Sequence, residues 1–195
     1  MKKPRVSVIK DNIKEGDSIP QAHNDGVVGK WIDNVMESKG HTVDKTGVMD
    51  LPEYGIDNKS RKKGSKTPHS IGSQTIEKWE AIENFEDTDI YKKVQNQNQI
   101  TYSTSFNVIT DVRIIDFDID IIQEALKDIY KNIRQKIVEG DRRKCIYSDC
   151  KRATAECYTH ENSYKLRLTD KFMTQIKNLA GSRDTFTSLF EFKQS

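Results

Sequence analysis

The chain has 195 residues, a formal net charge of +2, 34% hydrophobic residues and 32% charged residues. Its seven Phe, seven Tyr and two Trp supply enough apolar side chains for a core, so the composition excludes general disorder, and the length suits a single domain. Because no apolar run could span a bilayer and residues 1–14 lack the apolar stretch of a signal peptide, we expect a cytoplasmic protein with no membrane role.

The beginning of the chain predicts a polar lead-in followed by a helix. Residues 1–24 are polar without apolar periodicity, so we expect an irregular segment there and a folded domain over 25–195. Apolar residues then recur at helical spacing from Val27 to Met36. The pair Asn24-Asp25 offers a helix cap and Gly40 a stop, which predicts one amphipathic helix.

A β-hairpin and a loop are expected next. Residues 43–49 and 55–60 have the composition of two short strands, joined by a turn that contains Pro52 and Gly55. Residues 62–75 are rich in Lys, Ser, Gly and Pro and show no periodicity, which is typical of a loop.

The rest of the chain predicts a mixed α/β fold. Alternating β-branched and aromatic residues indicate strands, and an isoleucine-rich stripe that ends at Gly140 indicates a long helix. We expect Asp118 or Asp120 to cap that helix. The predicted elements are strands over 100–102 and 106–117, a helix to about residue 138, strands over 153–158 and 163–168, a helix over 170–180 and a strand over 185–192.

One group of residues carries recognisable chemistry. Asp50, Asp57 and Lys59 form the pattern Asp-x6-Asp-x-Lys, and the last two share one face of a predicted strand. Phosphodiester hydrolysis uses oxygen ligands that hold Mg²⁺ beside the phosphate and a cation that favours hydroxide. Two carboxylates and a lysine meet these requirements, but in a chain this rich in Asp, Glu and Lys the spacing alone assigns them no role.

The segment DLPEYGIDNKS, residues 50–60, resembles the PD-(D/E)XK nuclease motif in the compact form of MutH-like and type II restriction endonucleases. The preceding GVVGKWID resembles the Gly-x-x-x-Glu helix of these enzymes, which places Asp33 where the family has a metal-site glutamate. The chain departs from the pattern by offering Asp57 and Asp33 in place of glutamates. Glu37, one helical turn later, is the alternative to Asp33.

This resemblance implies a fold and an activity. The fold would be a restriction-endonuclease-like mixed β-sheet core flanked by helices, in a single domain. The activity would be Mg²⁺-dependent, sequence-specific endonucleolytic hydrolysis of double-stranded DNA, as restriction-like cleavage or MutH-like nicking, by a monomer or homodimer. One or two ions would be held by Asp50, Asp57 and Asp33, with Mn²⁺ as a substitute, and the catalytic residues would be Asp50, Asp57 and Lys59. It also implies a second catalytic lysine ahead of a later strand, for which Lys93 is the candidate.

Basic and aromatic side chains beyond the motif predict DNA contacts. The loop that leaves the strand of Lys59 is strongly basic, and phosphate neutralisation dominates such affinities. A late strand offers further groups, for which an exposed sheet face is an equal alternative. The predicted DNA-binding residues are Arg61, Lys62, Lys63, Lys66, His69, Tyr164 and Arg167.

Two alternatives stay open at this point. The carboxylates of the motif could be merely solvated, in a non-catalytic DNA-binding or interaction protein on the same fold, and metal dependence distinguishes the two functions. Cys145, Cys150, Cys157 and His160 supply four soft ligands, which is the number that a tetrahedral zinc site needs. Their spacing fits no common zinc module, and free cysteines are ordinarily small buried hydrophobic residues.

Overall fold

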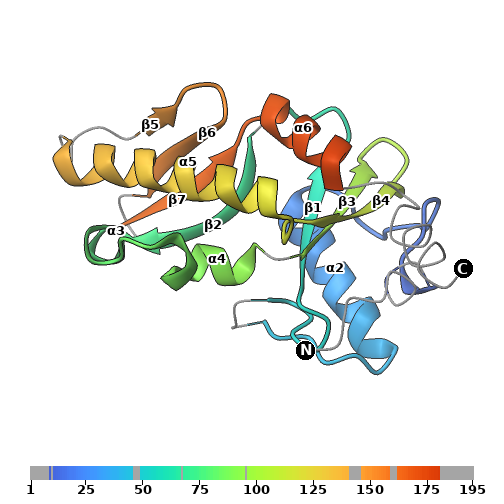
Figure 1. Cartoon of the computed structure of the whole chain (residues 1–195). Helices are drawn as coiled ribbons and strands as arrows, with labels where there is room; N and C mark the ends of the chain where they lie inside the picture. The colour runs from blue at the N-terminus through green and yellow to red at the C-terminus, as the bar shows by residue number, and fades with distance from the viewer. Residues whose placement is uncertain are drawn as a thin grey trace, which may run out of the picture. The chain divides into compact units, whose positions relative to one another are not determined.

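The computed structural model describes residues 9, 11–45, 49–66, 68–94, 96–140, 146–158 and 162–180 (Figure 1). They form a mixed α/β structure with two β-sheets, which confirms the predicted class. The chain divides into two compact units. Unit 1 comprises Met1–Ser65, Asn96–Asp116 and Ala180–Ser195, and unit 2 comprises Lys66–Gln95 and Phe117–Leu179.

Unit 1 holds a three-stranded sheet in the order β1-β3-β4, where β1 is Ile56–Lys62, β3 is Asn96–Ser103 and β4 is Val108–Asp116. β1 runs parallel to β3, and β3 pairs antiparallel with β4. The two strands expected around residues 100–117 are therefore confirmed as β3 and β4. β1, which carries the motif, lies at one edge of this sheet.

Helix α2, Asp25–Ser38, packs against β1. Its buried side chains, Val28, Ile32 and Met36, follow the predicted apolar stripe. The Asn24 side chain accepts a hydrogen bond from the Val27 N–H at 3.0 Å, so Asn24 is the N-cap. The predicted helix and its cap are confirmed.

The core of unit 1 begins earlier in the chain than expected. Ile9, Ile13 and Ile19 are at most 2% exposed and belong to the same apolar cluster as α2 and β1. Ser18 forms a β-bridge with Val108. The described residues before Asp25 are thus part of the fold, because isolated isoleucines in a polar segment can each reach the core without showing any periodicity.

The predicted hairpin before β1 is wrong in its first arm. Residues 43–45 and 49 are not in a strand, and 46–48 lie outside the described residues. A single bridge between Leu51 and Ile56 replaces the hairpin, while β1 pairs with β3 some 40 residues later. The predicted loop over 62–75 is also wrong in its second half, which forms strand β2.

Unit 2 holds an antiparallel sheet in the order β2-β7-β6-β5. Its strands are β2 (His69–Thr75), β5 (Ile146–Asp149), β6 (Ala153–Tyr158) and β7 (Ser163–Leu168). Its helices are α3 (Ile76–Ala81), α4 (Asp89–Lys93), α5 (Asp120–Glu139) and α6 (Asp170–Ala180), with a 3₁₀ turn η1 at Phe85–Asp87. The predictions of β6, β7, α5 and α6 are confirmed, whereas the predicted strand over 185–192 lies outside the described residues.

Helix α5 packs against β5 and α3. Trp79 of α3 stacks on Tyr130 of α5 with ring centroids 4.9 Å apart. The helix starts after Ile119, which makes no side-chain capping bond, so the expected cap by Asp118 or Asp120 is wrong. Within the part of the chain that the structure describes, no helix combines the length and apolar character that crossing a bilayer requires.

Candidate active site

A tight turn brings the two aspartates of the motif together. Leu51 N–H donates to the Ile56 carbonyl at 2.9 Å, and Ile56 N–H donates back to the Leu51 carbonyl at 3.3 Å. Gly55 closes the turn with φ +65°, a conformation that favours glycine. Asp50 and Asp57 are the residues that directly flank this bridge, one on each side of the turn.

Asp50 is held beside β1 by a backbone contact. Its Oδ2 accepts a hydrogen bond from the Asn58 N–H at 2.7 Å. Burial and the nearby charge of Asp57 raise the pKa of Asp50 to about 6, although the Asn58 N–H and Lys59 act in the opposite direction. Asp50 therefore titrates nearer to neutral pH than an ordinary aspartate.

Asp57 is a buried carboxylate paired with the lysine of the motif. It is 4% exposed, and its Oδ2 lies 2.6 Å from Lys59 Nζ. No described group makes a hydrogen bond of good geometry to this buried oxygen, so the ion pair is the contact that compensates it. The structure thus brings Asp50, Asp57 and Lys59 together, as the spacing predicted.

Helix α2 adds a third carboxylate to the charge cluster. Burial raises the pKa of Asp33, the Lys45 charge lowers it, and Glu37 and Asp57 raise it further. Glu37 itself is paired with Lys45, whose Nζ lies 2.9 Å from the glutamate Oε1. Asp33 is therefore within electrostatic range of the pair, and Lys45 is a nearby cation that the sequence reasoning missed.

Two hydrogen bonds fix the start of α2 on the sheet. Ser60 Oγ of β1 donates to the Asp25 carbonyl at 2.7 Å, and Tyr102 Oη of β3 donates to Asp25 Oδ1 at 2.6 Å. Burial and the Asp25 carboxylate raise the pKa of Tyr102. Neither contact has a sequence signal, because each joins residues that are 35 or more positions apart.

The side chains that could bind a metal ion can be compared with the ligands that Mg²⁺, the ion implied by the motif, requires. Over the described ranges, no three His, Cys, Asp or Glu side chains come close enough together to hold an ion. Mg²⁺ commonly binds through one or two carboxylates and completes its shell with water and substrate phosphate. The Asp50–Asp57 pair fits that pattern, since none of the described residues donates a hydrogen bond of good geometry to the buried Asp57 Oδ2. Asp33 as a ligand stays a prediction.

Burial in unit 2 contradicts two of the predicted DNA contacts, His69 and Tyr164, whereas DNA contact by the partly exposed Arg167 stays a prediction. His69 is buried on β2, with Nε2 2.9 Å from Asp170 Oδ1. Tyr164 is 1% exposed in the core, where burial raises its pKa to about 12. Arg167 pairs with Glu156 at 3.2 Å. Successive side chains of β7 point to opposite faces of the sheet, but the sequence alone does not tell which face is buried in the fold.

The basic segment, residues 61–66, begins in the last two residues of β1 and is largely exposed. Lys62, Lys63 and Lys66 are exposed, while Arg61 donates to the Ser65 carbonyl at 2.7 Å. Lys93 lies at the end of α4 in unit 2, near Asp89. DNA contact by the basic segment and catalysis by Lys93 stay predictions.

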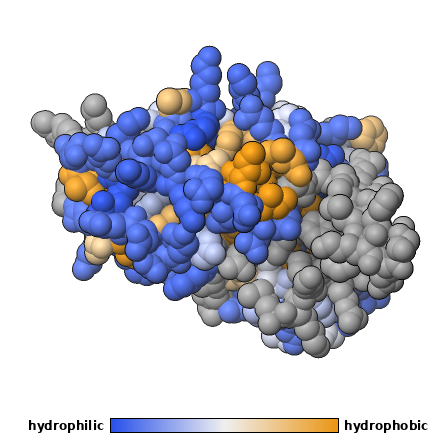
Figure 2. Space-filling view, viewed as in Figure 1, coloured by the Kyte–Doolittle hydropathy of each residue, from blue (hydrophilic) through white to orange (hydrophobic). Residues whose placement is uncertain are grey.

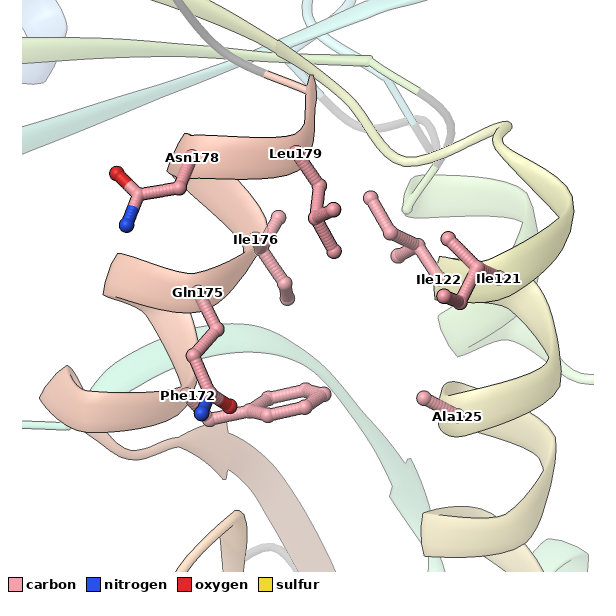
Figure 3. A pocket seen from close by; sticks show the side chains of 8 residues that line it. All are labelled: Ile121, Ile122, Ala125, Phe172, Gln175, Ile176, Asn178 and Leu179. Carbon is pink, nitrogen blue, oxygen red and sulfur yellow. The ribbon is translucent and has the colours of Figure 1, made fainter.

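The other candidates carry less chemistry. Cys150 is exposed and Cys157 is half-buried, both as free thiols, and Cys145 and His160 lie outside the described residues. A cavity of about 410 Å³ lies between α5 and α6, and Figure 2 shows an apolar patch on that face. Its walls are apolar side chains and two amides without an ionisable group: Ile121, Ile122, Ala125, Phe172, Gln175, Ile176, Asn178 and Leu179 (Figure 3).

Comparison with known proteins adds no assignment: no protein-family model matches the chain, and no curated protein matches it.

The raised pKa of Asp50 predicts a pH-dependent stability. The folded protein favours the protonated form of Asp50. The free energy of unfolding is therefore highest, as far as Asp50 is concerned, below about pH 3.8, and this stabilisation is lost as the pH rises through about 6. Asp50→Asn keeps an acceptor for the Asn58 N–H but has no charge. We expect it to exceed the wild type in free energy of unfolding by about 1–3 kcal/mol at pH 8, and by little at pH 4.

Chemical denaturation at a series of pH values measures this difference. Asp17→Asn is the matched control, because Asp17 also accepts a backbone N–H, that of Lys14, at an exposed site. A difference between Asp50→Asn and the wild type that does not change between pH 4 and pH 8 would contradict the burial of an ionised Asp50.

Proposed function

We propose that this chain is a Mg²⁺-dependent endodeoxyribonuclease that hydrolyses phosphodiester bonds in double-stranded DNA, on the pattern of the PD-(D/E)XK nucleases. The observation that carries the proposal is the site on β1. Asp50 and Asp57 flank the Leu51–Ile56 bridge, the charge of Asp57 helps to raise the pKa of Asp50, and Lys59 Nζ is 2.6 Å from the buried Asp57. Perturbed carboxylates beside a cation are typical of functional sites. A restriction-endonuclease-like arrangement of the sheet belongs to the same proposal.

Each residue has a distinct role in this proposal. Asp50 and Asp57 would hold the ion, Asp33 would add negative charge from α2, and Mn²⁺ is expected to substitute. When bound, Mg²⁺ supplies polarisation of the phosphate and a water of lowered pKa. Lys59 places a positive charge beside the carboxylates, where it favours hydroxide and offsets charge that develops on the phosphate.

Removing either carboxylate tests the metal site. We expect Asp50→Ala and Asp57→Ala to abolish cleavage of supercoiled plasmid in Mg²⁺ while they retain DNA binding in Ca²⁺, because each change removes a metal ligand and a charge that repels phosphate. Glu53→Ala is the control, since Glu53 is an exposed carboxylate in the same turn. Full cleavage by either aspartate variant, or cleavage in EDTA by the wild type, would refute the proposal.

Replacing the lysine separates chemistry from binding. Lys59→Met should retain DNA binding but lose on the order of 10²–10³ in the single-turnover cleavage rate, the usual effect of losing one preorganised electrostatic contact. The measurement uses saturating enzyme and plasmid. A rate within about threefold of the wild type would show that Lys59 takes no part in the chemistry.

The exposed basic segment should govern affinity. Replacing Arg61, Lys62, Lys63 and Lys66 by Gln is expected to weaken DNA binding and to flatten its salt dependence, because each lost phosphate contact lowers counterion release. Fluorescence anisotropy at several salt concentrations gives the slope of the logarithm of the DNA affinity against the logarithm of the salt concentration. The charge-matched control replaces four exposed lysines elsewhere: Lys14, Lys30, Lys39 and Lys171. Equal slopes for the two variants would remove the segment from the interface.

A further inference from the structure

The two carboxylates of the site are compensated in different ways. Asp50 Oδ2 accepts a backbone hydrogen bond from Asn58 at 2.7 Å. Asp57 Oδ2 is buried without a hydrogen bond from any described group, and it lies 2.6 Å from Lys59 Nζ. A charge at such a site requires a partner of opposite sign, and here the lysine provides it.

The geometry of this contact limits what else the oxygen can bind. Mg²⁺–oxygen distances are about 2.0–2.1 Å and Ca²⁺–oxygen distances about 2.3–2.6 Å. An ammonium 2.6 Å from the same oxygen would then stand close to the ion, and two cations at that separation repel strongly in a partly buried site. Asp57 Oδ2 therefore has room for one cation at a time.

Lys59 is able to leave. Its side chain is 37% exposed, compared with 6% for that of Asp57, and it ends in a compact ammonium on a flexible four-carbon stem. Moving the ammonium outward exposes it to water, and a divalent ion then takes its place as the partner of the enclosed Asp57.

We propose that Lys59 occupies the cation position at Asp57 in the metal-free protein, and that a divalent ion and the Lys59 ammonium compete for Asp57 Oδ2. This inference rests on the proposed function and concerns the regulation of the same site. Ion binding releases the lysine, so its ammonium becomes free to meet a DNA phosphate only when the ion is in place. The competition also lowers the affinity of the site for divalent ions in the absence of DNA.

Calorimetric titration with Ca²⁺ at pH 8, without DNA, tests the competition. Lys59→Met should bind Ca²⁺ roughly tenfold more tightly than the wild type, because it lacks the competing charge. Lys59→Arg keeps a cation and should stay close to the wild-type affinity. Lys30→Met is the control, since Lys30 is an exposed lysine on α2.

The outcomes separate this inference from the proposed function. Wild-type binding of Ca²⁺ with equal or weaker binding by Lys59→Met would overturn the competition and leave the metal site standing. Absence of Ca²⁺ binding in both proteins would overturn the competition and the proposed metal site together.

Losing Lys59 leaves a buried carboxylate unpaired and lowers the stability of the variant, so a second measurement uses the unaltered chain. With lysines labelled with ¹³C at Cε, the Lys59 resonance should shift on Ca²⁺ addition, while that of Lys30 should not. Assignment by Lys59→Arg identifies the signal. A Lys59 resonance that stays unchanged when Ca²⁺ saturates the protein would refute release of the lysine.

Discussion

The exchange of backbone hydrogen bonds between Leu51 and Ile56 is the constraint on which the candidate site depends. Both side chains are fully buried in the core of unit 1, so the turn between them is held by the same packing that holds β1. Asp50 and Asp57 directly flank this bridge. Because side chains alternate along a strand, a slip of one residue would turn Asp57 to the other face and separate the pair.

Bringing two carboxylates together in a partly buried place has an electrostatic cost. The raised pKa of Asp50, at about 6, reflects this cost, and the ion pair of Asp57 with Lys59 offsets part of it. A fold without any use for the pair would gain stability by replacing one aspartate with a neutral residue. Cation binding offers a physical reason for keeping both charges, since a bound cation removes the repulsion between the two carboxylates and is attracted by both of them.

The sequence predicted what depends on local spacing and failed where distant segments meet. Asp57 and Lys59 were placed on one face by the period of a strand, and Asp50 was added because the short segment 50–60 resembles a nuclease motif. Helix α2 was found from its apolar period and its cap. The parallel pairing of β1 with β3 has no local signal, since the partner strand lies 40 residues away. Tyr164 was misjudged because alternation reveals two faces of a strand, and only the tertiary fold decides which is buried.

Diffraction from crystals grown with Mn²⁺, recorded at the manganese absorption edge, locates a bound ion without reference to any activity. If Asp50 and Asp57 hold the ion, an anomalous peak will lie within bonding distance of both carboxylates. A protein saturated with Mn²⁺ whose anomalous peaks all lie elsewhere, with Lys59 still paired to Asp57, would contradict this assignment.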